Sequence, residues 1–225
     1  TQATGFAYEV VVVMDQKDWK GPAGEAIKSE LASSVPGLPQ AEPSLKITYV
    51  QPKDFTGLLR YVRNILVVTI DPTAYTKVSV GYENNVWARG QVVVSLKAPN
   101  TESIVEYSKT HEKALVNFFV KVEMNRAIEQ LQKEYSMVVM DNLKSDLNVM
   151  LNAPANFTYY KDTTDFFWSS NNANTGRMDL IVYTFPYTDP NTFTEEYLVA
   201  KRDSVLKANL PGSFPGSYMQ TETRA

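Results

Sequence analysis

Few residues of this 225-residue chain have the types and spacing that catalysis requires. The chain has no cysteine and one histidine, His111, which excludes a thiolate nucleophile, disulfides and histidine-rich metal sites. His111 precedes Leu115 and Phe118 at helical spacing, so we expect it to be packed on an apolar helix face rather than to act as a general base. No Gly-x-Ser-x-Gly pattern marks a nucleophilic serine. We therefore predict no catalytic residue, no metal site and no cofactor.

Two acidic pairs come nearest to a hydrolytic site. Asp162 and Asp165 fall where the sequence favours a turn. Glu195, next to Glu196, lies three residues after Thr192, a spacing that predicts a helix-capping box. A glycosidase needs two carboxylates about 5 to 10 Å apart across a cleft, and closeness in sequence does not provide this arrangement. A carboxylate-dependent hydrolase is therefore kept as the alternative function.

Aromatic side chains are the best candidates for contact with a ligand. Tyr160 and Trp168 belong to a segment rich in Tyr and Phe, and an Asn-rich loop begins at Asn171. Rigid aromatic faces bind apolar or sugar surfaces at low entropic cost. Arg126 follows Glu123 by three residues on a predicted helix, where it can form a local ion pair or contact a ligand. The predicted ligand-binding residues are Trp168, Tyr160, Asn171 and Arg126.

Composition restricts the class of partner. The chain has 22 basic and 25 acidic residues, a net charge of -3, and no basic stripe, so we do not expect it to bind nucleic acid. A hydrophobic content of 44% and a charged content of 21% are typical of a globular protein with a buried core. No apolar run approaches the ~18 residues that span a bilayer. Because the chain begins at Thr1 without a signal-like segment, we expect any targeting segment to have been removed.

Hydrophobic periodicity predicts the elements that must position these residues. A Gly-Pro start predicts a helix from about residue 21 to 33, and a second helix begins near residue 192. The segment from Asn100 to Asn152 contains neither Pro nor Gly, which predicts a long helical segment with a break near Ser136. β-branched and aromatic runs predict strands at 10–13, 45–50, 65–70, 77–82, 92–94, 157–160, 165–169, 178–185 and 218–223.

Together these elements predict an α+β fold, with mixed, largely antiparallel sheet or sheets covered by a long helical segment. The expected domains are a first α+β half at 1–99, the helical segment at 100–152, and a second, C-terminally truncated α+β half at 153–225. One pattern of residue types occurs twice with the same spacing, at residues 29, 31 and 35–37 and again at residues 204, 206 and 210–212. This repeat predicts an internal duplication, unless two helices independently end at Pro-Gly stops.

Segments spread over the whole chain resemble an uncharacterised family of Bacteroidetes cell-envelope lipoproteins, domain of unknown function 4837. The matching segments are 8–15, 19–22, 35–40, 63–65, 71–73, 86–88, 98–100, 118–121, 123–126, 165–168, 187–194 and 201–204. The resemblance implies a lipid-attached cysteine upstream, a location in the cell envelope on the periplasmic or outer-membrane face, and a continuation beyond Ala225. It implies no catalytic residue.

Two functions follow as hypotheses. The first is a non-enzymatic envelope lipoprotein that acts as a binding or scaffold module, with an envelope protein or glycan as partner. Its only contact with a membrane would be through a lipid anchor absent from this chain. The alternative is a carboxylate-dependent hydrolase of envelope polysaccharide or peptide. The sequence leaves the oligomeric state open, including assembly through exposed strand edges.

Overall fold

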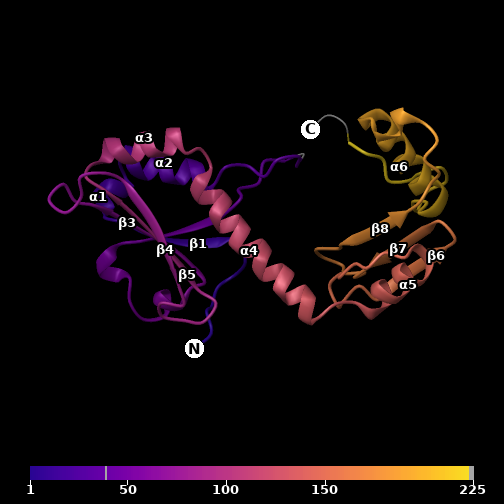
Figure 1. Cartoon of the computed structure of the whole chain (residues 1–225), viewed down its shortest axis with the longest axis horizontal. Coiled ribbons are helices and arrows are strands. Elements are labelled where there is room, and N and C mark those ends of the chain that lie inside the picture. The colour runs from indigo at the N-terminus through magenta and orange to yellow at the C-terminus, as the bar shows by residue number, and fades with distance from the viewer. Residues whose placement is uncertain (39, 223–225) are drawn as a thin grey trace. The chain divides into compact units, whose positions relative to one another are not determined.

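The computed structural model describes residues 1–38 and 40–222, and its contacts divide the chain into two compact units (Figure 1). Unit 1 is Thr1–Arg126 and unit 2 is Ala127–Ala225. Helices and two separate sheets confirm the predicted α+β class. The predicted helical segment at 100–152 is shared between the units, because helix α4 (Ala114–Lys133) crosses their boundary. None of the helices that the structure describes is long and apolar enough to cross a membrane.

Unit 1 is built on a five-stranded sheet with the order β2-β1-β3-β5-β4. β1 pairs in parallel with β2 and β3, β3 pairs in parallel with β5, and only β4 is antiparallel to its neighbour. The sequence predicted largely antiparallel sheets. This prediction holds for the sheet of unit 2, whereas the sheet of unit 1 is mostly parallel. The strands are β1 (Glu9–Val13), β2 (Lys46–Val50), β3 (Asn64–Ile70), β4 (Ser79–Asn84) and β5 (Val92–Ala98).

The β-branched runs of this sheet are buried on both faces, as parallel strands require. On one face, Val10 and Val12 pack with Ile27 of α2 (Pro22–Leu31) and Phe119 of α4. Helix α3 (Thr101–Thr110) lies beside α2 over the same core (Figure 1). On the other face, Val11 and its neighbours pack under the 3₁₀ helices η1 (Pro52–Asp54) and η2 (Gly57–Tyr61).

A close contact between two helices depends on Gly24. The short helix α1 (Gln16–Trp19) precedes α2, and a Cβ at residue 24 would lie 2.0 Å from the carbonyl oxygen of Trp19. No real Cβ tolerates that distance, so only glycine fits. The ring of Trp19 stacks parallel to that of Tyr49, with ring centroids 4.7 Å apart.

Unit 2 contains an antiparallel three-stranded meander with the order β6-β7-β8. Phe167 on the central strand packs with Val139 and Leu143 of α5, so α5 covers one face of this sheet. The elements are α5 (Met137–Leu147), β6 (Tyr159–Thr163), β7 (Phe166–Ser170), β8 (Asp179–Tyr183), the 3₁₀ helix η3 (Pro190–Phe193) and α6 (Glu195–Asn209).

Two local predictions are wrong. His111 is exposed rather than packed in the core, because α3 ends at Thr110 and His111 stacks on Tyr107 at 4.2 Å between centroids. The N-cap of the last helix is Thr194, not Thr192, because the intervening turn is the 3₁₀ helix η3.

The predicted internal duplication is also wrong. The first Pro-Gly turn joins α2 to a strand that is parallel to β1, whereas α6 follows an antiparallel meander. The predicted strand at 218–223 is reduced to a single bridge between Pro211 and Tyr218 within the described residues, and Thr223 lies outside them. The shared sequence pattern therefore reflects two similar helix stops.

Candidate functional site

The register of the three-stranded sheet decides which side chains share a face. Tyr159 pairs with Ser170, and Ser170 pairs with Asp179 on the next strand. Paired residues of antiparallel strands lie on the same face, and successive residues alternate between faces. Tyr159, Trp168 and Asp179 therefore lie on one face, opposite the face that α5 covers. We call the surface formed by Tyr159, Trp168, Arg177 and Asp179 the Trp168 face.

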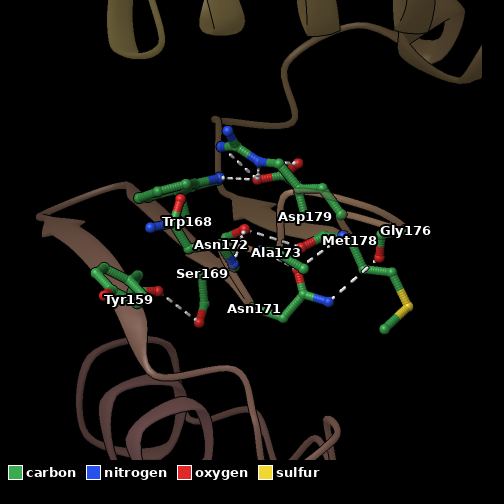
Figure 2. A network of polar contacts seen from close by, with 11 residues as sticks. Tyr159, Trp168, Ser169, Asn171, Asn172, Ala173, Gly176, Met178 and Asp179 are labelled. Carbon is green, nitrogen blue, oxygen red and sulfur yellow. Dashed lines mark hydrogen bonds and ion pairs between the residues drawn. The ribbon is translucent and has the colours of Figure 1, made fainter.

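Hydrogen bonds fix the indole of Trp168 on this face. Trp168 Nε1 donates to Asp179 Oδ1 at 2.9 Å, and Figure 2 shows the indole reaching toward this carboxylate. Arg177 donates to the same carboxylate from Nε at 3.1 Å and from Nη2 at 3.0 Å. The Arg177 guanidinium also lies 5.9 Å from the centroid of the Trp168 ring, within the range of a cation–π contact. The aromatic ring and the ion pair form one connected group.

The charge state of Asp179 follows from these contacts. Partial burial raises the pKa of this carboxyl, but hydrogen bonds from Arg177 and Trp168 outweigh burial and hold the pKa below its usual value. Asp179 is therefore ionised over the physiological pH range. An ionised carboxylate accepts hydrogen bonds only, which suits partners that present N–H or O–H donors.

The predicted ligand residue Asn171 organises the loop between β7 and β8. Its Oδ1 accepts hydrogen bonds from the backbone N–H groups of Ala173 at 3.2 Å and Met178 at 3.0 Å. Its Nδ2 donates to the carbonyl oxygen of Gly176 at 3.3 Å (Figure 2). The carboxamide thus holds the loop in shape, which places the start of β8 and with it Asp179.

The two adjacent tyrosines on β6 lie on opposite faces. Tyr159 is 56% exposed and Tyr160 is 53% exposed. The predicted ligand residue Tyr160 pairs with Ser169 and lies over Phe167, with ring centroids 6.4 Å apart, on the face that α5 covers. The structure therefore does not bring Tyr160 and Trp168 together on one face. Tyr159 lies on the same face as Trp168, where Lys161 is the residue directly opposite Trp168 and donates a hydrogen bond to the carbonyl oxygen of Asn209 at the end of α6.

The fourth predicted ligand residue, Arg126, belongs to a buried network in unit 1. Glu123, only 2% exposed, accepts hydrogen bonds from Arg126 Nη1 at 2.6 Å and from Asn64 Nδ2 at 2.7 Å. Arg63 Nη2 lies 2.9 Å from the same carboxylate. Arg126 also donates to the backbone carbonyl oxygen of Gly90 at 2.8 Å. These contacts attach α4 to the amino ends of β3 and β5, which is a structural role.

The acidic residues form a different pair from the one the sequence suggested. Asp146, rather than Asp165, is the acidic side chain that acts on the pKa of Asp162. Burial and the neighbouring Asp146 raise the pKa of Asp162, whereas the hydroxyl of Ser145 and Asp162 lower the pKa of Asp146. Within the described part of the chain, no three His, Asp or Glu side chains are grouped so that they can hold a metal ion.

The sequence signal for the site was incomplete. Tyr- and Phe-rich composition led to Trp168, but nothing in the sequence gave the register that places Arg177 and Asp179 beside it. Alternation along β6 separates Tyr159 from Tyr160, yet choosing between them requires knowing which face a helix covers.

Comparisons with known proteins give two family matches. Residues 3–132 match the model of Domain of unknown function (DUF8532), and residues 136–225 match the model of Domain of unknown function (DUF4837). The second match supports the family resemblance over residues 136–225, whereas the first part of the chain matches a separate family. No curated protein and no solved structure matched the chain.

Proposed function

The chain belongs to the DUF8532 family of domains of unknown function through residues 3–132, and from this starting point we propose that it acts as a non-enzymatic binding module. The proposed binding surface is the Trp168 face of unit 2, and the proposed ligand class is a glycan. The observation that carries the proposal is the fixed orientation of Trp168 beside a charged hydrogen-bonding pair.

Preorganisation supports binding at this surface. Asp179 and Arg177 hold the indole of Trp168 in place before any ligand arrives. A ring that is already ordered loses little side-chain entropy on binding, so more of the contact energy becomes affinity. The exposed ring of Tyr159 lies on the same face and offers a second aromatic contact. Two such rings are suited to the flat apolar side of a sugar.

The polar groups favour a glycan over a purely apolar ligand. Arg177 Nη1 donates no hydrogen bond within the described residues, so it is available to a hydroxyl oxygen. Asp179 remains ionised and accepts hydrogen bonds from hydroxyl groups. A sugar ring presents both an apolar side and a rim of hydroxyls, which fits an aromatic surface flanked by a carboxylate and a guanidinium.

We further propose that this binding takes place in the cell envelope, with the chain attached to a membrane through a lipid anchor outside the present sequence. The match of residues 136–225 to DUF4837 and the resemblance to Bacteroidetes cell-envelope lipoproteins support this location. The partner is then an envelope glycan, and an envelope protein is the competing occupant. A net charge of -3 argues against a nucleic-acid partner.

The hydrolase hypothesis is favoured by one observation, the effect that Asp146 and Asp162 have on the pKa of each other. Retaining glycosidases separate their carboxyl groups by about 5 to 5.5 Å and inverting ones by about 6.5 to 9.5 Å. Asp146 is exposed, and a mutual effect on pKa does not by itself define two carboxylates facing each other across a cleft, so we retain the binding function.

The test is calorimetric titration of the full chain with soluble fragments of envelope polysaccharide. We expect Trp168→Ala and Tyr159→Ala each to weaken binding by about tenfold, equivalent to about 1.4 kcal/mol, since each removes an aromatic contact. Tyr160→Ala is the matched control, because Tyr160 is almost equally exposed but lies on the other face.

Equal loss of affinity in Tyr159→Ala and Tyr160→Ala would contradict the assignment of the face. Absence of binding by the unsubstituted chain to every polysaccharide fragment would contradict the glycan class.

A further inference from the structure

A second candidate binding site lies in unit 1. A cavity of about 530 Å³ opens between the segments 33–36 and 42–44 and the start of α4. Its apolar lining comes from Val35, Pro36, Pro43, Val116 and Val120. Pockets for small molecules usually measure about 300 to 1,000 Å³ and are mostly apolar with a few placed polar groups. The cavity has the size and the lining of such a pocket.

Strained backbone occurs at two positions of this cavity. Among the described non-glycine residues, five have positive φ, and three of these are asparagines, which tolerate that conformation. The other two are Tyr8, with φ 60°, and Lys113, with φ 61°, and both line the cavity. Such strain costs about 1 to 3 kcal/mol per residue and is concentrated at ligand-binding sites.

Two exposed side chains of opposite charge line the same cavity. Lys113 and Glu42 both belong to its wall, and neither forms an ion pair with any residue that the structure describes. The two also do not pair with each other. A ligand that satisfies both side chains carries an anionic group, a cationic group and an apolar body.

We propose that this cavity binds a short apolar peptide with free termini. The peptide carboxylate pairs with Lys113, its ammonium group pairs with Glu42, and its side chains contact Val116 and Val120. The site is separate from the Trp168 face, and it does not depend on the proposed glycan binding.

The charge assignment is tested by calorimetric titration of the full chain with the dipeptide Leu-Leu and its capped forms. We expect Leu-Leu to bind, and Leu-Leu-amide and N-acetyl-Leu-Leu each to bind about tenfold more weakly, as expected for one lost charge-assisted hydrogen bond. Lys113→Asn removes the charge with a residue that tolerates positive φ. It should weaken Leu-Leu about tenfold and leave the affinity for Leu-Leu-amide unchanged, and Glu42→Gln should behave likewise toward N-acetyl-Leu-Leu.

The location is tested by filling the cavity. Val35→Trp should abolish Leu-Leu binding, whereas Val86→Trp should not, because Val86 is 40% exposed, close to the 38% of Val35, and does not line the cavity. The proposal is overturned if the unsubstituted chain does not bind Leu-Leu, or if Lys113→Asn weakens Leu-Leu and Leu-Leu-amide equally. Equal effects of the two tryptophan substitutions, or tighter binding of decanoate than of Leu-Leu, would overturn it as well.

Discussion

Glu30 joins two helices of unit 1 through its buried carboxyl group. It lies on α2, and its Oε1 accepts a hydrogen bond at 2.7 Å from the backbone N–H of Leu115, in the first turn of α4. The first N–H groups of a helix lack partners within the helix, so an acceptor from another element stabilises the helix start. Burial nevertheless raises the pKa of Glu30 above its usual value, because it outweighs the hydrogen bond from Leu115.

This pKa shift predicts how the stability of unit 1 depends on pH. A carboxyl group with a raised pKa holds its proton more tightly in the folded state than in the unfolded state. The free energy of unfolding therefore falls as the pH rises from the unfolded pKa, near 4.5, through the raised folded pKa. Glu30→Gln keeps an oxygen acceptor for Leu115 and cannot ionise, so this fall should be absent from the variant.

The measurement is urea denaturation of both proteins between pH 4 and pH 8. The stability of Glu30→Gln relative to the unsubstituted chain should increase with pH across this window. Parallel pH profiles would contradict the prediction. Glu25→Gln, an exposed substitution on the same helix, is the control and should leave the profile unchanged.

Residue-scale predictions from sequence succeeded where the interaction is local. The helical spacing of Glu123 and Arg126 predicted their ion pair, which the structure contains. The contacts of Glu123 with Arg63 and Asn64 join residues about 60 positions apart, which periodicity cannot detect. His111 was misplaced because the strained turn at Lys113 interrupts the helix, so the apolar stripe that seemed to include His111 is not continuous.

At the scale of elements, Ser136 marks the predicted break between α4 and α5. Its hydroxyl oxygen accepts a hydrogen bond from the N–H of Val139, and the hydroxyl group donates to the carbonyl oxygen of Phe157 at 2.5 Å. Ser136 is buried, so both partners rely on it rather than on water. The cap thus begins α5 and also attaches it to the segment before β6.

We predict that Ser136→Ala destabilises unit 2 by about 1 to 3 kcal/mol, because it removes a helix cap and leaves a buried carbonyl oxygen unpaired. Ser145→Ala, an exposed position on the same helix, is the control and should change stability by less than about 0.5 kcal/mol. Thermal unfolding followed by circular dichroism measures both. Equal effects of the two substitutions would show that the cap does not stabilise the unit.

Strand positions were predicted more accurately than strand partners. A run such as Val10 to Val13 indicates burial on both faces, but β-branched residues favour parallel and antiparallel pairing alike.

The predicted internal duplication was wrong because the sequence repeat is local to two turns. Both Pro-Gly turns close with one antiparallel bridge, Ser34 to Pro43 in one and Pro211 to Tyr218 in the other, and this likeness is confined to the turns.

At the scale of the whole molecule, each unit has a core of its own. The core of unit 1 lies on both faces of the five-stranded sheet, and that of unit 2 lies between α5 and the three-stranded sheet. The boundary at Arg126 falls inside the continuous helix α4. The positions of Pro and Gly residues could not indicate this boundary, because helix α4 continues through it without a break.

Separate cores predict two transitions in differential scanning calorimetry. Glu123→Ala should lower only the transition of unit 1, by the equivalent of about 3 kcal/mol, because it leaves Arg63 and Arg126 without their buried partner. Ser136→Ala should lower only the transition of unit 2. A single transition that both substitutions shift would mean that the units unfold together.

The contact at Gly24 has a consequence for comparing this chain with its relatives. The backbone of Trp19, whose ring stacks on Tyr49, lies where a side chain at residue 24 would clash with it. A methyl group at residue 24 would force helices α1 and α2 apart and move the Trp19 ring away from the Tyr49 ring. We therefore expect a family member without this glycine to lack the ring stack, even if both aromatic residues are still in its sequence.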